Sequence, residues 1–274
     1  MKNIGININT SKDKNQIVLE SIIDTIRKNK EDVDITLFKD SEGITSQTVG
    51  KLDMMIVLGG DGTILRTSRK MEENKIPILG INIGHLGFLT NVTTDDFSQI
   101  IKQIFEGSFS IEKRMRINCK INNNEIDYTA LNDVVLARGI LSRIVNFSVY
   151  IDETYYSDFI SDGIIISTPT GSTAYNLSAG GPIIHSKLDV ITVTPICPHS
   201  INMRSIVLDS KSTIKVKPSI TEEQLYLTLD GQEAIELKKG DEITISISKN
   251  KCKFIKLQQD DYFKLLREKI IYRN

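Results

Sequence analysis

The chain has few of the features that mark disulfide-rich, membrane-spanning or nucleic-acid-binding proteins. Its 274 residues include three cysteines, Cys119, Cys197 and Cys252. Their odd number and wide spacing argue against a disulfide framework or a zinc site. The sequence has no run of about 18 apolar residues, so we expect no transmembrane helix. The formal net charge of −1 gives no electrostatic reason to expect a nucleic acid or an anionic membrane as a partner.

Targeting and metal-binding patterns are also absent. Residues 1–5 lead directly into a strand-like pattern, so we expect no signal peptide. Together with the dispersed cysteines, this favours a cytoplasmic protein whose thiols are reduced and buried. His85, His185 and His199 lack the spacing of metal ligands, and we expect each of them to be structural or peripheral.

The composition is that of an ordinary globular protein, 40% hydrophobic and 25% charged, and the length predicts one large or two medium domains. The first hundred residues alternate between strand and helix patterns, which favours a doubly wound, Rossmann-like parallel sheet. We expect residues 39–50, which are polar, to form a loop. The expected strands are 4–8, 33–38, 53–58 and 77–82, and the expected helices lie within 11–26, 63–73 and 94–106.

From about residue 108 the pattern changes to an alternation of apolar and polar residues, as at Ile117, Cys119 and Ile121. A period of two predicts a mainly antiparallel domain of many strands. From Asp260 a helical pattern resumes, and we expect this last helix to return to the α/β part. The sequence therefore predicts an α/β domain of residues 1–107 plus 259–274 and a β domain of residues 108–258.

A glycine-rich turn follows the third expected strand, where an apolar run ends in Gly59-Gly60-Asp61-Gly62-Thr63. Glycines let backbone N–H groups approach an anion closely, and the helix that follows adds the positive end of its dipole. The turn is not a Walker A loop, because no Lys-Ser/Thr pair follows, and it lacks the third glycine of the Rossmann fingerprint. A carboxylate in such a turn fits phosphoryl transfer to a hydroxyl, with Asp61 accepting the proton or organising Mg²⁺. Alternatively, Asp61 is the N-cap of the helix.

A second glycine-containing block runs from Ser161 to Pro182. After an apolar strand at 164–166 it offers five hydroxyls in seven residues, at positions 167, 168, 170, 172 and 173. We interpret this loop as a site for a polyhydroxylated, phosphate-bearing ligand, with Tyr175 able to stack on a ring. The alternative is a Ser/Thr-rich turn that caps a helix beginning near Thr173. A weaker signal is Asn132-Asp133, which opens another apolar run.

These motifs together resemble those of the NAD kinases. Gly59–Thr63 is similar to the GGDGT motif of that family, and residues 84–88 match its GHLGF segment. Leu131-Asn132-Asp133 resembles its Asn-Glu site, and residues 161–182 match its second signature, including the STPTGSTAY core at 167–175. The resemblance covers nearly the whole chain. GGDGT alone also occurs in lipid kinases, whereas the second block is far more specific.

The resemblance implies transfer of the γ-phosphate of ATP to the 2′-hydroxyl of the adenosine ribose of NAD, with Mg²⁺ or another divalent cation. It implies Asp61 as general base, a site in the cleft between two domains, and homodimers or homotetramers. The residues that it places in contact with nucleotide are Gly59, Gly60, Asp61, Gly62, Thr63, Arg66, Asn132, Asp133, Arg143, Asp162, Thr173, Ala174, Tyr175, Asn176, Leu177, Ser178 and Gln232.

Two departures from the family pattern concern binding detail. Asp133 stands where many members have Glu, and Ile160 stands where some bacterial members have Arg. A lipid kinase and a non-catalytic NAD(P) sensor are the alternatives to a kinase acting on NAD. The absence of a basic amphipathic patch disfavours the first, and the presence of Asp61 disfavours the second. The sequence leaves open whether polyphosphate replaces ATP and whether NADH is accepted.

Overall fold

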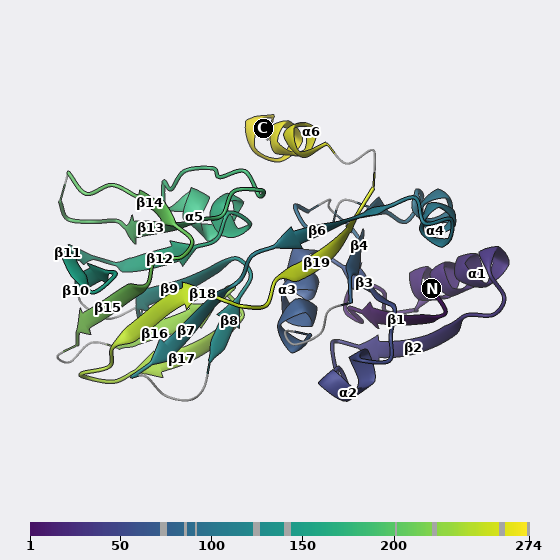
Figure 1. Ribbon diagram of the computed structural model, residues 1–274, viewed down its shortest axis with the longest axis horizontal. Coiled ribbons are helices and arrows are strands. Elements are labelled where there is room, and N and C mark those ends of the chain that lie inside the picture. Colours follow the sequence, from purple (N-terminus) through teal and green to yellow (C-terminus); the bar gives the residue numbers. More distant parts are fainter. Residues whose placement is uncertain are drawn as a thin grey trace. The chain divides into compact units, whose positions relative to one another are not determined.

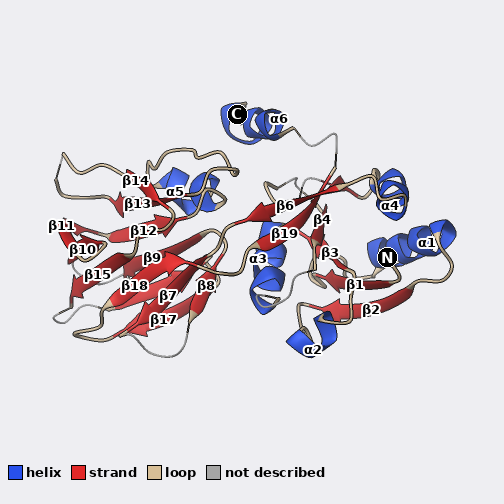
Figure 2. Ribbon diagram, viewed as in Figure 1, coloured by secondary structure: helices blue, strands red, loops and turns tan. Residues whose placement is uncertain are grey.

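The computed structural model describes residues 1–71, 76–84, 87–90, 92–122, 127–139, 144–200, 202–220, 224–257 and 261–272. The chain forms two compact units (Figure 1). The N-terminal unit comprises Met1–Lys113 and Cys252–Asn274, and the C-terminal unit comprises Arg114–Lys251. Helices are concentrated in the first unit and strands in the second (Figure 2).

A seven-stranded sheet forms the centre of the N-terminal unit. Its order is β2-β1-β3-β4-β19-β6, with β5 paired to β4, and β1 to β5 and β19 pair in parallel. The strands are β1 (Asn3–Ile8), β2 (Asp34–Lys39), β3 (Met54–Gly59), β4 (Ile78–Asn82), β5 (Val92–Thr93), β6 (Ser110–Arg114) and β19 (Cys252–Lys256). Every residue of β3 and of β4 is buried, which explains why both strands are continuous apolar runs in the sequence.

Two helices with wide apolar faces cover one face of this sheet. Side chains at alternate positions of β1 and β3, such as Ile6 and Ile56, form one cluster with Ile22 of α1 and Phe97 of α4. The opposite set of β3 residues, such as Val57, points to the other face, where α3 contacts β3 and β4. The helices of this unit are α1 (Ile17–Asn29), α2 (Ser46–Val49), α3 (Asp61–Lys70), α4 (Phe97–Phe105), α6 (Tyr262–Leu266) and η2 (Arg267–Ile271).

Two antiparallel six-stranded sheets make up the C-terminal unit. One has the order β11-β10-β15-β18-β7-β8 and the other the order β14-β13-β12-β9-β16-β17. The strands are β7 (Ile117–Ile121), β8 (Tyr128–Ala130), β9 (Asp133–Arg138), β10 (Val145–Ile151), β11 (Thr154–Ser161), β12 (Gly163–Ser167), β13 (Val190–Ile196), β14 (Ile206–Asp209), β15 (Ile214–Ser219), β16 (Leu225–Leu229), β17 (Glu233–Leu237) and β18 (Ile243–Ile247).

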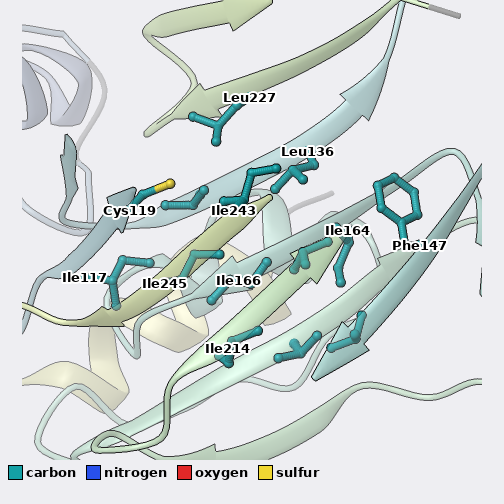
Figure 3. Close-up of a cluster of buried hydrophobic side chains, with 14 of the residues drawn as sticks. Ile117, Cys119, Leu136, Phe147, Ile164, Ile166, Ile214, Leu227, Ile243 and Ile245 are labelled. Atoms are coloured by element: carbon teal, nitrogen blue, oxygen red, sulfur yellow. The ribbon is translucent and has the colours of Figure 1, made fainter. Parts of the chain in front are cut away.

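The core of the C-terminal unit lies between these two sheets. Figure 3 shows Cys119 of β7 and Ile243 of β18 in the same cluster as Leu136 of β9 and Ile164 of β12. Along β7, buried and partly exposed residues alternate, as the period of two predicts. The two-part fold expected from the sequence, a doubly wound α/β sheet followed by antiparallel β-sheets, is therefore confirmed.

Some details differ from the sequence-based expectations. The expected loop 39–50 contains the short helix α2, which the Thr45 and Thr48 side chains cap reciprocally. The return to the N-terminal unit is made first by β19, which joins the parallel sheet beside β4. β6 and β19 both belong to that sheet, so the chain passes from one compact unit to the other at residues 113/114 and 251/252. Among the described residues, the helices are all too short or too polar to cross a membrane.

Candidate functional site

In the parallel sheet of the N-terminal unit, the direction in which successive strands are added reverses between β1 and β3. From β1 the chain continues to β2 on one side and returns to β3 on the other. Doubly wound sheets bind ligands at such switch points, beyond the carboxyl ends of the strands. The residues that follow β1 and β3 are therefore the candidate site of this unit, and the Gly59–Thr63 motif lies there.

Asp61 is the first residue of α3, and its carboxylate is surrounded by hydrogen-bond donors. Its Oδ2 accepts the N–H of Phe88 (2.8 Å). Its Oδ1 accepts the N–H groups of Leu89 (3.0 Å) and Thr90 (3.1 Å) and the Thr90 hydroxyl (3.1 Å). The N-cap of α3 is Gly60, without a side-chain cap, so the alternative that Asp61 is the N-cap is wrong. The side chain instead ties the 87–90 segment to the glycine turn.

Gly87 makes this arrangement possible. A Cβ atom there would collide with Asp61 Oδ1 and would lie 2.5 Å from Asp61 Cγ and 2.6 Å from Thr90 Oγ1. Glycine is therefore required by the close approach of the backbone to a carboxylate. Gly84 is described and exposed, whereas His85 and Leu86 of the same motif lie outside the described residues.

The rest of the glycine turn is held by the segment after β1. The N–H of Asn9 donates to the Leu58 carbonyl (3.0 Å), and Asn9 Nδ2 donates to Thr63 Oγ1 (3.2 Å). A Cβ on Gly59 would lie 2.8 Å from the Thr63 Cβ, so close packing accounts for this glycine. Gly62 is exposed at the start of α3.

Two cationic side chains accompany this turn. The position of a Cβ on Gly60 would be 2.9 Å from Lys12 Nζ, so the Lys12 ammonium lies against the Gly60 backbone. Arg66 is exposed one turn into α3. Its charge contributes, after hydrogen bonds from Thr10, to a lowered pKa of the Asp40 carboxyl. The switch point thus combines exposed cations with a helix N-terminus, an arrangement that attracts anions.

Asn132 and Asp133 come together with a third residue in the C-terminal unit. The carboxylate of Asp230 accepts the N–H groups of Leu131 (3.2 Å), Asn132 (2.7 Å) and Asp133 (3.3 Å). Asp133 is 3% exposed. Burial, with the negative charge of Asp230 as the second cause, raises the pKa of the Asp133 carboxyl to about 7.

The hydroxyls of the second glycine-containing block point mainly into the protein. Ser167, Thr168 and Ser172 are fully buried, and each donates to a backbone carbonyl, for example Thr168 Oγ1 to Leu131 (2.6 Å). Thr170 is buried as well, and its hydroxyl accepts a hydrogen bond from Arg114 (3.4 Å). The interpretation of these hydroxyls as a ligand-binding array is wrong for these four residues, because they are buried: three of them bond backbone carbonyls, and Thr170 bonds Arg114.

The exposed part of this block is the short segment that follows. The 3₁₀ turn η1 (Gly171–Thr173) leads into α5 (Tyr175–Ser178). Tyr175 is 47% exposed, and Thr173, Ala174, Leu177 and Ser178 retain partial or full exposure.

Asn176 is fully buried within the same segment. Its Nδ2 donates to the carbonyls of Ser172 and Pro182, and its Oδ1 accepts the Thr194 hydroxyl (2.7 Å). Because its polar atoms have these partners, Asn176 holds the loop.

The remaining expected site residues are placed as follows. Asp162 pairs with Arg138, whose Nε lies 2.7 Å from Asp162 Oδ1. Gln232 is exposed in the turn between β16 and β17. Arg143 lies outside the described residues. Within the described ranges, His, Cys, Asp and Glu side chains form no group of three or more that could hold a metal ion.

Comparison with known proteins decides the family. Residues 4–109 match the model of the ATP-NAD kinase N-terminal domain, and residues 131–257 match that of the ATP-NAD kinase C-terminal domain. The chain is 47% identical over 276 residues to an NAD kinase of Clostridium botulinum (strain Kyoto / Type A2), covering 100% of this chain and 98% of the relative. The chain belongs to the ATP-NAD kinase family. It is an NAD kinase (EC 2.7.1.23) that phosphorylates NAD to NADP, with ATP and NAD as its substrates.

Further relatives of the kinase agree in sequence and in fold. It is 50% identical over 274 residues to an NAD kinase of Clostridium kluyveri (strain ATCC 8527), covering 99% and 96% of the two chains. A solved NAD kinase from Archaeoglobus fulgidus in complex with ATP is 26% identical, with a TM-score of 0.79 and 94% of each chain covered. The yeast NADH kinase complexed with NADH has the same fold, with a TM-score of 0.88 at 24% identity over 100% and 89% of the chains. The resemblance stated from the motifs is confirmed, and the lipid-kinase and sensor alternatives are wrong.

Sequence reasoning overlooked two polar residues of the kinase that lie beside the predicted sites. Lys12 falls in the range 11–26, where a helix was expected, although α1 begins at Ile17. Asp230 lies in an Asp-Gly sequence that is typical of an ordinary hairpin turn. The one available signal for Lys12 was its position directly after a buried strand, where switch-point loops begin. For Asp230 no local signal exists, because its hydrogen-bond partners are about a hundred residues away.

Proposed function

We propose that Asp61 is the general base of this kinase and that it accepts the proton of the ribose 2′-hydroxyl of NAD as the γ-phosphate of ATP arrives. The observation that carries this proposal is its position, a carboxylate on the first residue of a helix that follows glycines at the switch point of a doubly wound sheet. From the described part of the chain, Asp61 Oδ2 accepts one hydrogen bond, donated by the N–H of Phe88. A carboxylate oxygen has about two lone-pair directions, so one direction is left for the substrate hydroxyl.

The phosphates of ATP are proposed to bind at the glycine turn of residues 59–63. Backbone N–H groups at the start of α3 and its helix dipole favour negative charge there. Lys12 against Gly60 and the exposed Arg66 supply full positive charges. Mg²⁺ or another divalent cation would neutralise charge on the phosphates and would be held mainly by the phosphate oxygens.

The dinucleotide NAD is proposed to bind to the C-terminal unit. Asn132, Asp133 and Asp162 provide hydrogen-bond acceptors, and Tyr175 provides an exposed ring for stacking. Thr173, Ala174, Leu177, Ser178 and Gln232 complete the exposed surface of the proposed site, with Arg143 added from the family resemblance. Asn176 contributes by holding the segment in place, since its side chain is buried. The functional division proposed from the sequence is residues 1–107 with 259–274 for phosphates, and 108–258 for NAD.

The proposal extends to assembly and location. The family resemblance supports a homodimer or homotetramer in the cytoplasm. Size-exclusion chromatography with light scattering measures the oligomeric state. A coupled assay for NADP formation, run in parallel with ATP and with polyphosphate and with NAD and NADH, defines the substrate range.

The decisive experiment replaces Asp61 by Asn. Loss of a general base lowers kcat by about 10²–10⁴-fold. The amide also places a donor opposite an N–H donor of the 88–90 segment, so binding must be measured separately by isothermal titration with ATP and NAD. We expect near-normal Kd values with a strongly reduced kcat. Near-normal turnover of Asp61→Asn would exclude the role of base.

A matched control is Asp53→Asn in the same unit. Asp53 also accepts two backbone N–H groups, from Lys2 and Asn3, but it lies at the amino end of β3. This variant is expected to lose some thermal stability and to keep kcat. A similar fall of kcat in both variants would attribute the loss to backbone support in general.

A further inference from the structure

Asp230 occupies a hairpin turn that is unusually enclosed. It follows β16 and precedes Gly231, and both residues have positive φ (53° and 63°), as a tight β-hairpin turn requires. Aspartates in such turns are mostly exposed to solvent, yet Asp230 is 8% exposed. β16 pairs with β9, so the turn faces the start of β9 and the residues before it.

The carboxylate of Asp230 captures three consecutive backbone N–H groups. These belong to Leu131, Asn132 and Asp133, at 3.2, 2.7 and 3.3 Å. The N–H of Asp230 donates in return to the Asp133 carbonyl (3.0 Å). An Asn would suit the turn conformation equally well, but its amide would place N–H donors toward N–H donors. The acceptor-only carboxylate is therefore explained by the three N–H groups and not by the turn.

The same three residues are held from the opposite side by the second glycine-containing block. The N–H of Thr168 donates to the Asn132 carbonyl (2.8 Å), and Thr168 Oγ1 donates to the Leu131 carbonyl (2.6 Å). A Cβ on Gly171 would lie 2.7 Å from the Asn132 Cα. The peptide groups of residues 131–133 are thus fixed on both sides, and their side chains have a defined direction.

We propose that Asp230 is a positioning residue for NAD, because it fixes the backbone of Asn132 and Asp133 so that both side chains are presented to the dinucleotide. This inference rests on the proposed role of Asn132 and Asp133 in NAD binding. Asp230 does not touch the substrate, and its contribution passes through the peptide groups that it binds.

A second consequence is electrostatic. The elements beside Asp133 are β12, where Ser167 faces it, and the turn after β16, where the charged residue is Asp230. Burial is the larger cause of the raised pKa of Asp133, and the charge of Asp230 is the other. Removal of the Asp230 charge lowers the pKa of Asp133, so the midpoint of any pH dependence of NAD binding moves to lower pH. This shift would report the charge of Asp230, whereas a selective rise in KM for NAD would report its hold on the backbone.

The test is Asp230→Asn in the full-length kinase, assayed for KM with NAD and with ATP over a range of pH. We expect KM for NAD to rise about tenfold, the scale of a buried N–H left without its acceptor, while KM for ATP stays within about twofold. The midpoint of the pH profile of KM for NAD should move to lower pH. Unchanged KM for NAD with an unshifted profile would overturn the proposal, as would equal increases for both substrates.

Asp152→Asn is the matched control. Asp152 also sits in a hairpin turn of the C-terminal unit with positive φ (50°), and it accepts the N–H of Thr213 (2.8 Å). It should keep both KM values. If Asp230→Asn does not fold, Thr168→Val serves instead, because it removes the hydroxyl bond to Leu131 from the other side. A selective rise in KM for NAD supports the positioning role there too, and an unchanged value contradicts it.

Asn132→Ala separates failure of this inference from failure of the proposed NAD site. If Asn132→Ala raises KM for NAD and Asp230→Asn does not, the site stands and the positioning role of Asp230 is wrong. If neither variant changes KM for NAD, the proposed site itself is wrong.

Discussion

The two candidate sites of this kinase differ in the groups that surround an aspartate side chain. In the N-terminal unit, Asp61 receives three backbone N–H groups and a hydroxyl, and Lys12 lies beside the same glycine turn. In the C-terminal unit, the carboxyl group of Asp133 is almost fully buried, and its charged neighbour is another carboxylate, Asp230. One site is rich in donors and positive charge, and the other is rich in acceptors.

This difference corresponds to the chemistry of the two substrates. A triphosphate offers acceptors and negative charge, so it needs donors, cations and a helix N-terminus. The ribose hydroxyls and the amide groups of a dinucleotide offer donors as well, so they can use carboxylate and carbonyl acceptors. The comparison therefore predicts that changes around Asp61 act on catalysis and ATP, and that changes around Asp133 act on NAD and on pH dependence.

The largest expected effect on this contrast comes from Gly87→Ala, which disrupts the hydrogen-bond donors around Asp61. In Gly87→Ala the new methyl group would collide with the Asp61 carboxylate, so the 87–90 segment must move away from it. Asp61, the proposed base, is still present, but its orientation is lost, and misplacement of about 1 Å costs on the order of 10²-fold in rate. We expect kcat to fall by about that factor in the coupled NADP assay.

Gly50→Ala provides the control for Gly87→Ala. Gly50 is another glycine of this unit with a tight surrounding, because a Cβ there would lie 3.0 Å from the Ser46 carbonyl oxygen, but this glycine ends α2. Gly50→Ala should lose less thermal stability than Gly87→Ala, because its contact is longer, and it should retain kcat. A Gly87→Ala enzyme with normal kcat would show that Asp61 does not depend on the 87–90 segment.

The sequence predicted the two-part fold because each part has its own hydrophobic period. Strands buried on both faces, such as β3, are continuous apolar runs, and strands with one buried face, such as β7, alternate. Asp61 and Asn132-Asp133 could also be proposed from the sequence as site residues, since their motifs are short and contiguous.

The contacts that organise these sites could not be predicted in the same way. Asp61 binds residues 27 to 29 positions away, and Asp230 binds residues 97 to 99 positions away; such pairings follow from strand order and not from local pattern. The buried hydroxyls of Ser167 and Thr168 were misread because a Ser or Thr hydroxyl serves a ligand or its own backbone equally well. Only burial distinguishes the two uses.

A smaller effect, on the pH dependence of stability, is expected from Asp133 in the acceptor-rich site. The folded protein keeps a proton on this carboxyl up to about pH 7, whereas the unfolded chain loses it near the ordinary aspartate pKa of 3.8. The contribution of the Asp133 carboxyl to the free energy of unfolding is therefore complete at low pH and declines as the pH rises toward 7. Asp133→Asn removes this decline, so between pH 5 and pH 6 the wild type should lose about 1 kcal/mol relative to the variant.

Chemical denaturation at the two pH values measures this difference. Asp127→Asn is the control, because Asp127 is an exposed carboxylate of the same unit, paired with Lys120. It should follow the pH dependence of the wild type. If Asp133→Asn and the wild type change in parallel between pH 5 and pH 6, the Asp133 carboxyl does not hold a proton in this range, and the electrostatic contrast between the two sites is absent.

The smallest expected effect concerns Lys12 on the donor-rich side. Lys12→Gln removes the ammonium that lies against Gly60 and keeps most of the side-chain length. One solvent-exposed ion contact contributes about 1 kcal/mol or less, so KM for ATP should rise by up to about fivefold while KM for NAD is unchanged. The difference should shrink at high ionic strength, because salt screens exposed charges. Lys14→Gln, in the same exposed segment, should match the wild type, and equal effects of the two variants would indicate a general surface-charge effect in place of a phosphate contact by Lys12.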